Sequence, residues 1–272
     1  MQQNGSKKDR RHQVILDTLE TNSAVRIGEL AGMLGVSAET IRRDLQELED
    51  KGEICRTYGG AVRNLVAEPI LAERLTVNYE ERKRVTFEAV EHIGDADHIF
   101  LCGGSTAMHF ARALVETLRR DLTVLTISIG VAEELSRSPH IQTMLLPGIF
   151  DAKERVVYGP ETIAAIEKYH PPLTIMSASA LDHLGLSEAI LVYAHTHAAM
   201  IQHSERTLVM IESLKFGRRA LTQIATWNPR MHLVTDTMRD ERIRTAIEEA
   251  GARITTADHP AVGVPLRAGQ GG

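Results

Sequence analysis

The chain has 272 residues, of which 43% are hydrophobic and 25% are charged. This composition can bury a hydrophobic core and excludes a disordered chain, and the length fits one large domain or a small domain followed by a medium-sized one. The formal net charge of -5 excludes a uniformly basic nucleic-acid-binding protein but allows a locally basic face.

The chain shows no sign of a membrane segment or of a metal site. Its first residues lack the apolar stretch of a signal peptide, and no apolar run approaches the ~18 residues that cross a bilayer. Cys55 and Cys102 lie far apart, and the histidines, including His195 and His197, match no metal-ligand spacing. We therefore expect a cytoplasmic protein without membrane contact, metal or cofactor.

The first 63 residues predict three short helices and a hairpin. Apolar residues recur with helical spacing, and in the third helix the buried ones are Ile41, Leu45 and Leu48. Gly35 is placed to end the second helix, and Ser37 to cap the third. A short strand, the glycine pair 59–60 and a returning strand follow. This order of elements predicts a small winged helix-turn-helix domain over residues 1–63.

The third helix presents two adjacent arginines, Arg42 and Arg43, away from its apolar side. The second helix of a helix-turn-helix lies in the DNA major groove, where arginine grips guanine or phosphate. The alternative is a solvated surface charge balanced by the acids that follow, Asp44, Glu47, Glu49 and Asp50. The whole pattern favours double-stranded DNA, with contacts predicted for Ser37, Thr40, Arg42, Arg43, Arg56 and Tyr58.

The pattern changes after a predicted linker at residues 64–78. Short apolar runs then alternate with helix-like stretches, which indicates a larger, mostly parallel α/β domain over residues 79–257. The runs are HIFLC, LTVLTI, IQTMLL, LTIMSA, TLVMIE and MHLVTD. The Pro- and Gly-rich residues 258–272 are expected to form a flexible tail.

A Gly-Gly-Ser-Thr loop, residues 103–106, joins the first of these runs to a helix. Backbone N–H groups and hydroxyls at a helix start favour an anion, although an ordinary strand-to-helix turn is the alternative. Thr126, Ser128 and the stretch 177–182 follow two other strands. Ligands of parallel sheets bind at the carboxyl ends of the strands, so we expect a small anionic ligand there.

The stretch from Val36 to Ala61 resembles the winged helix of the DeoR family of bacterial transcriptional regulators. The matching residues are Val36, Ser37, Thr40, Ile41, Arg42, Arg43, Asp44, Leu45, Gly59, Gly60 and Ala61. Tyr58 stands where the family usually has histidine. The resemblance implies that Ser37, Thr40, Arg42 and Arg43 touch an operator, and it continues more loosely to about Asp236.

For the second domain the resemblance implies a fold like ribose-5-phosphate isomerase and a phosphorylated sugar as effector. The chain departs from the family pattern at several positions, among them Cys102 and Ser179 in place of aspartates and His197 in place of a lysine, and in the loop 177–182 only the final aspartate of the family motif is kept. Lys215 and Asp182 match. The predicted effector-binding residues are Gly103, Gly104, Ser105, Thr106, Thr126, Ser128, Ser179, Asp182, His197 and Lys215.

We therefore expect a DNA-binding repressor of a carbohydrate-metabolism operon, acting as a homodimer or homotetramer and released or modulated by a phosphorylated sugar or related metabolite. The alternative is a sugar-phosphate isomerase-like enzyme with an N-terminal adaptor domain. Such an enzyme needs a positioned base beside a carbonyl. Cys102 and Ser179 replace two acids, and Asp182 remains as the obvious carboxylate, so we expect a regulator with no catalytic residues.

Overall fold

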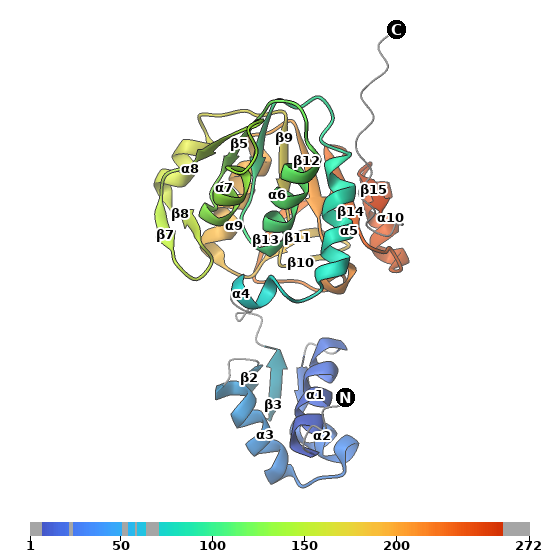
Figure 1. Cartoon of the computed structure of the whole chain (residues 1–272). Helices are drawn as coiled ribbons and strands as arrows, with labels where there is room; N and C mark the ends of the chain where they lie inside the picture. The colour runs from blue at the N-terminus through green and yellow to red at the C-terminus, as the bar shows by residue number, and fades with distance from the viewer. Residues whose placement is uncertain (1–6, 22–23, 51–53, 58, 64–70, 258–272) are drawn as a thin grey trace. The chain divides into compact units, whose positions relative to one another are not determined.

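The chain divides into two compact units, Met1–Glu68 and Pro69–Gly272 (Figure 1). Each has a hydrophobic core of its own. The predicted tail, Tyr58 and residues 64–70 of the predicted linker lie outside the described residues. The computed structural model describes residues 7–21, 24–50, 54–57, 59–63 and 71–257.

The first unit has the predicted three helices and hairpin, with one additional strand, β1. Its three strands form an antiparallel sheet in the order β1-β3-β2. A Cβ atom on Gly60 would lie 1.9 Å from the carbonyl oxygen of Val25, so the approach of β3 to β1 requires glycine. The elements are α1 (Lys7–Thr21), β1 (Ala24–Arg26), α2 (Ile27–Leu34), α3 (Ala38–Asp50), β2 (Ile54–Thr57) and β3 (Gly60–Arg63).

Helix α3 carries a buried carboxylate, Asp44, among its apolar residues. Arg11 of α1 donates to both carboxylate oxygens, at 2.8 and 2.9 Å, and His12 Nε2 lies 3.2 Å from Oδ1. Asp44 is therefore paired with α1 and does not balance the charge of Arg42 and Arg43, as the alternative of a solvated surface charge required. Burial alone raises the pKa of Asp44, but the hydrogen bonds and charges of Arg11 and His12 outweigh it and hold that pKa below its usual value.

The second unit is built on a seven-stranded sheet, and all its neighbouring strands are parallel. The strand order is β15-β14-β12-β9-β4-β5-β6, which confirms the predicted α/β class; β15 was not predicted. The strands are β4 (His98–Leu101), β5 (Leu122–Thr126), β6 (Ile141–Leu145), β9 (Leu173–Met176), β12 (Arg206–Met210), β14 (Met231–Thr235) and β15 (Arg253–Thr256).

Helices α5, α6 and α7 pack side by side over this sheet (Figure 1), while α9 packs against β9 and α10 against β15. The interior is filled by large apolar side chains such as Phe100 and Phe110. A short helix, α4, lies inside the segment that we expected to be a linker. The helices are α4 (Leu71–Arg74), α5 (Tyr79–Val90), α6 (Ser105–Thr117), α7 (Ile129–Leu135), α8 (Pro160–Ile166), α9 (Leu191–Gln202) and α10 (Glu241–Glu249), with a 3-10 turn, η1 (Ser213–Lys215).

Two antiparallel additions were not predicted from the sequence. A hairpin pairs β7 (Ile149–Asp151) with β8 (Val156–Tyr158). A small sheet has the order β10-β11-β13, with bounds Ala180–Asp182, Gly185–Glu188 and Thr222–Thr226. Helix α9 contacts β11 and β13 of this small sheet as well as β9 of the parallel sheet, so it packs between the two.

Replacing Asp44 by Ala is expected to destabilise the first unit by about 3 kcal/mol, because Arg11 then loses the partner for a half-buried charge. The single tryptophan, Trp227, lies in the second unit. In urea unfolding of the intact chain, far-UV circular dichroism should therefore show that the first unit unfolds at a lower urea concentration than in the parent. Tryptophan fluorescence, which reports on the second unit, should keep its parental midpoint.

Glu47→Ala is the control for Asp44→Ala, because it removes an ion pair with Lys8 in which both side chains are more than 40% exposed; such pairs contribute less than about 1 kcal/mol. Since the pKa of Asp44 is depressed in the fold, its contribution is full above the unfolded value of about 4 and is lost as the pH falls through the lower folded value. Equal destabilisation by the two variants at neutral pH would contradict the proposed role of Asp44.

Candidate functional site

Arg42 and Arg43 lie on the outer face of α3, where their side chains are 54% and 78% exposed. Glu39 approaches both guanidinium groups, at 3.2 Å from Arg42 and 3.8 Å from Arg43. Exposed pairs of this kind contribute less than about 1 kcal/mol. The two arginines can therefore exchange Glu39 for a phosphate or a base edge at little cost.

The beginning of α3 carries two hydroxyl groups. Ser37 Oγ accepts a hydrogen bond from the backbone N–H of Thr40 at 3.1 Å and lies 2.9 Å from the Thr40 hydroxyl. Ser37 therefore caps the helix, as predicted. On the wing, Arg56 of β2 pairs with Ala61 of β3 in the strand register, and Tyr58 lies outside the described residues.

The 103–106 loop forms a close-packed turn between β4 and α6. Gly104 has a φ of 93° and precedes α6 without a side-chain cap, and a Cβ atom on Gly103 would lie 2.3 Å from Cγ1 of Val156. Ser105 and Thr106 are buried in the first helical turn. The uncapped start of this helix favours an anion, because its backbone N–H groups have no intrahelical partners.

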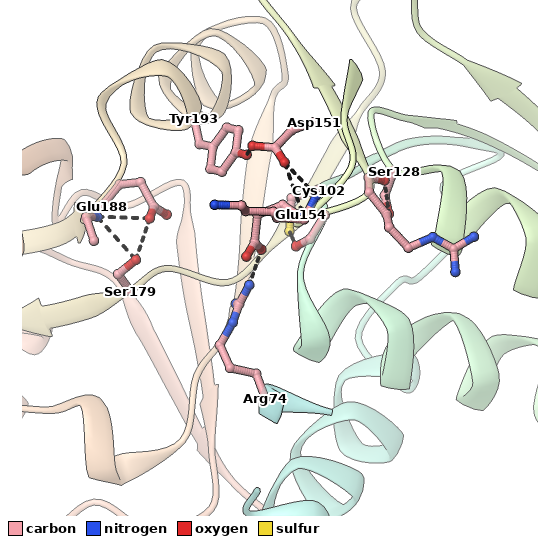
Figure 2. A network of polar contacts seen from close by, with 12 residues as sticks. Arg74, Cys102, Ser128, Asp151, Glu154, Ser179, Glu188 and Tyr193 are labelled. Atoms are coloured by element: carbon pink, nitrogen blue, oxygen red, sulfur yellow. Dashed lines mark hydrogen bonds and ion pairs between the residues drawn. The ribbon is translucent and has the colours of Figure 1, made fainter. Parts of the chain in front are cut away.

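Arg74, at the end of α4, lies beside this helix start. Its Nη1 atom is 3.7 Å from the place that a Cβ of Gly104 would occupy, and its guanidinium pairs with Glu154 (Figure 2). A cation and a carboxylate therefore meet next to the glycine loop. Neither residue was predicted from the sequence, since Arg74 falls in the predicted linker and Glu154 lies between two strands that were not predicted.

Glu154 is held in place by the turn between β7 and β8. Asp151 accepts hydrogen bonds from the backbone N–H groups of Lys153 and Glu154, at 2.7 and 3.2 Å. The hydroxyl of Tyr193, from α9, donates to the other Asp151 oxygen at 2.5 Å (Figure 2) and holds the pKa of that carboxyl below its usual value. The turn that presents Glu154 is thereby tied to α9.

Thr126, Ser128 and Asp182, which we predicted to bind the effector, already have hydrogen-bond partners within the protein. Thr126 Oγ1 accepts the backbone N–H of Ser128 at 3.1 Å, and Ser128 Oγ caps α7. Both residues are fully buried. Asp182 accepts hydrogen bonds from Arg219, at 2.6 and 2.9 Å, and from a backbone N–H of its own turn. These side-chain oxygens accept hydrogen bonds within local turns, a helix cap and an ion pair. The spacing of the residues in the sequence does not predict these hydrogen bonds.

Ser179 and His197 meet at a buried carboxylate, Glu188, which the sequence analysis did not select. The Ser179 hydroxyl donates to Glu188 Oε1 (Figure 2), and His197 Nδ1 lies 3.4 Å from Oε2. Burial raises the pKa of Glu188, but His197 and Ser179 outweigh it and lower the value to about 2. The register of β10 on β11, with Ala180 opposite Ser187, brings Glu188 here, and no sequence motif indicates it.

Cys102 and Lys215 complete this edge of the sheet. Cys102 is fully buried, and burial raises the pKa of its thiol to about 12. Its sulfur accepts the backbone N–H of Ser177 at 3.4 Å. Lys215 Nζ donates to the carbonyl oxygen of Ala178 at 3.0 Å. Cys102 is therefore a packed, protonated thiol, and Lys215 supplies a positive charge beside the loop after β9.

Within the described part of the chain, every helix is too short or too polar to cross a lipid bilayer. The same residues include no group of three or more His, Cys, Asp or Glu side chains placed to hold a metal ion.

Two curated regulators and one solved enzyme structure are similar to this chain. The uncharacterized HTH-type transcriptional regulator YulB of Bacillus subtilis is 32% identical, over 90% of this chain and 95% of its own. The HTH-type transcriptional repressor CsqR of Escherichia coli is 26% identical, over 90% and 94%. Ribose 5 phosphate isomerase A from Neisseria gonorrhoeae matches with a TM-score of 0.35 and 19% identity, over 52% of this chain and 55% of that one.

Two family models match the chain. Residues 11–65 match the DeoR-like helix-turn-helix domain. Residues 77–237, more than half of the chain, match the DeoR C terminal sensor domain. A helix-turn-helix with two outward arginines and a parallel sheet with an uncapped helix start are joined in one chain, which belongs to the DeoR family of DNA-binding transcriptional regulators.

Proposed function

We propose that this regulator represses a carbohydrate-metabolism operon and that a phosphorylated sugar, bound by the sensor unit, changes its affinity for operator DNA. The observation that carries the proposal is the glycine loop at the start of α6 with Arg74 beside it. A helix start and a guanidinium together favour a phosphate group.

The Escherichia coli relative is named a transcriptional repressor, which supports repression rather than activation by this protein. The isomerase-like alternative is not retained, because the chain belongs to a family of transcriptional regulators. The effector acts by binding more tightly to one of two forms of the protein, and that difference in affinity sets the strength of the response.

In this proposal the phosphate lies at Gly103, Gly104, Ser105 and Thr106, and Arg74 joins Lys215 as a supporting cation. Arg74 already pairs with the carboxylate of Glu154. A phosphate that reaches Arg74 has to compete with that carboxylate. Glu154 therefore lowers the affinity for phosphate and, by the same exchange, links ligand binding to the β7–β8 turn.

Replacing Arg42 or Arg43 by Ala is expected to weaken operator binding by about 1–3 kcal/mol if the lost contact is to a base edge. A lost phosphate contact would instead lower the slope of the logarithm of the binding constant against the logarithm of the salt concentration by about one. The measurement is fluorescence anisotropy across salt concentrations, on DNA that the purified protein selects from a random library.

Arg137→Ala is the charge-matched control for the two α3 variants, because Arg137 is 68% exposed and lies in the sensor unit. It should bind DNA like the parent. If all three variants keep the parental affinity and salt dependence, α3 does not read the operator.

Gly104→Ala and Arg74→Ala are each expected to reduce the affinity for inorganic phosphate about tenfold, because the first adds a methyl group at the helix start and the second removes a cation. Glu154→Gln should act in the opposite direction and strengthen binding, since it removes the competing carboxylate. Isothermal titration calorimetry on the intact protein measures all three.

Gly251→Ala is the matched control for Gly104→Ala, because Gly251 also has a positive φ, of 73°, and lies after α10. It carries the same kind of backbone strain without touching the loop. Weaker phosphate binding by Glu154→Gln would show that Glu154 supports the site rather than competing for it.

A homo-oligomer, dimer or tetramer, is also part of the proposal. Strand β6 ends the parallel sheet, and apolar side chains are 41–55% exposed on β6 and the adjacent β7. Exposed apolar edge strands are pairing surfaces, and we infer that a second copy covers this one. These side chains are Met144, Leu145, Ile149 and Phe150.

Ile149→Lys combined with Phe150→Lys is expected to shift the protein from oligomer to monomer in sedimentation velocity, because two charges enter an apolar contact. Leu221→Lys is the control, since Leu221 is 63% exposed elsewhere in the sensor unit. A parent that sediments as a monomer at concentrations that saturate DNA would remove the oligomer from the proposal.

A further inference from the structure

Three buried polar atoms near the carboxyl ends of the parallel strands have no hydrogen-bond partner among the described residues. They are Ser177 Oγ, His197 Nδ1 and Glu212 Oε2. Ser177 directly follows β9, Glu212 follows the neighbouring strand β12, and His197 lies on α9, which packs against β9. Buried polar groups are nearly always hydrogen-bonded, so three such atoms at one edge call for an explanation.

Ser177 lies beside Cys102, His197 beside Glu188, and Glu212 at the start of the turn that carries Lys215. The backbone N–H of Ser177 donates to the Cys102 sulfur at 3.4 Å, and the charges of both Glu188 and Lys215 act on the same thiol. On one side, His197 Nδ1 lies 3.4 Å from Glu188 Oε2 without a hydrogen bond. On the other, the backbone N–H of Lys215 donates to the carbonyl oxygen of Glu212 at 2.9 Å.

The protonation of Glu212 decides which groups can bind it. Arg82 donates to Oε1 at 2.5 Å, and none of the described residues donates a hydrogen bond to Oε2. Burial raises the pKa of Glu212, but the charges of Lys215 and Arg82 outweigh it and lower that pKa. Glu212 is therefore an ionised carboxylate that only accepts hydrogen bonds, and its partner has to bring an N–H or O–H group.

Ser177 and His197 can both complete hydrogen bonds with hydroxyl groups. A serine hydroxyl donates and accepts, and the neutral imidazole presents a donor on one nitrogen and an acceptor on the other. A sugar carries several hydroxyls on neighbouring carbons, each able to donate and accept. Thr126, Ser128 and Asp182, which we first expected in this role, already have partners in helix caps, turns and an ion pair.

We propose that Ser177, His197 and Glu212 bind the hydroxyl groups of the effector, so that the ligand is a polyhydroxylated phosphate monoester with at least one hydroxyl donated to Glu212. This inference rests on the proposed function and deepens it. It assigns the recognition of the sugar to three side chains that each have one polar atom without a hydrogen-bond partner among the described residues, instead of to Thr126, Ser128 and Asp182. Ordered water at the same atoms is the competing explanation, and it predicts no preference for any sugar.

The test compares inorganic phosphate with a panel of pentose and hexose monophosphates by isothermal titration calorimetry on the intact chain. For the monophosphate that the parent binds best, Ser177→Ala and His197→Phe should each reduce the affinity about tenfold, the loss expected for one buried hydrogen bond. Their affinity for inorganic phosphate should stay within about twofold of the parent, because the phosphate loop is untouched.

Asp182→Asn is the matched control, since it alters a polar residue at the same edge that already has partners, and it should keep the parental preference. Glu212→Gln weakens the pair with Arg82, so its folding is checked by tryptophan fluorescence. Ser177→Ala and His197→Phe do not depend on that check.

Two results separate this inference from the proposed function. If the parent binds inorganic phosphate and a sugar monophosphate, but Ser177→Ala and His197→Phe keep the parental preference, the recognition of hydroxyls by these residues is wrong while the proposed function stands. Loss of the preference in Asp182→Asn alone would return the sugar to Asp182. If the parent binds neither phosphate nor any sugar monophosphate, the proposed function fails and the inference fails with it.

Discussion

The parallel order of the seven-stranded sheet is the constraint on which the sensor unit depends. Parallel strands end at a common edge, so the residues that follow β4, β9 and β12 are brought together although more than one hundred positions separate the first from the last. Cys102, Ser177 and Glu212 each follow one of these strands. The same order leaves β6 as a terminal strand of the sheet, with exposed apolar side chains.

The buried charged side chains near this edge of the sheet stay ionised because each lies beside a partner. A buried ion is costly to remove from water unless an opposite charge and hydrogen bonds compensate it. Arg82 pairs with Glu212, and for Glu188 the hydroxyl of Ser179 donates to one carboxylate oxygen while His197 Nδ1 lies 3.4 Å from the other. Within the described residues, Glu212 Oε2 and His197 Nδ1, together with the hydroxyl of Ser177, still have no hydrogen-bond partner, which is an expected property of a site that a polar ligand completes.

The DNA-binding unit uses charge in two opposite ways. Asp44 is buried and ties α3 to α1 through Arg11, whereas Arg42 and Arg43, immediately before it, are exposed and only loosely paired. The helical period of 3.6 residues produces this separation, because Asp44 lies three positions from Ile41 and shares its buried side. A rigid inner face thus holds two adaptable arginines toward the solvent.

The sequence by itself determined the class of fold, the winged helix-turn-helix, the six predicted strands of the parallel sheet and the direction of Arg42 and Arg43. These follow from local periodicity and capping, which a single chain segment encodes. Only the tertiary structure decided that Asp44 is buried, that Arg74 lies beside Gly104, and that Glu188 and Glu212 approach the sheet edge. It also revealed that Thr126, Ser128 and Asp182 already have partners. Such pairings join distant segments through strand register and side-chain hydrogen bonds. The spacing of residues along the chain predicts neither the register nor these hydrogen bonds.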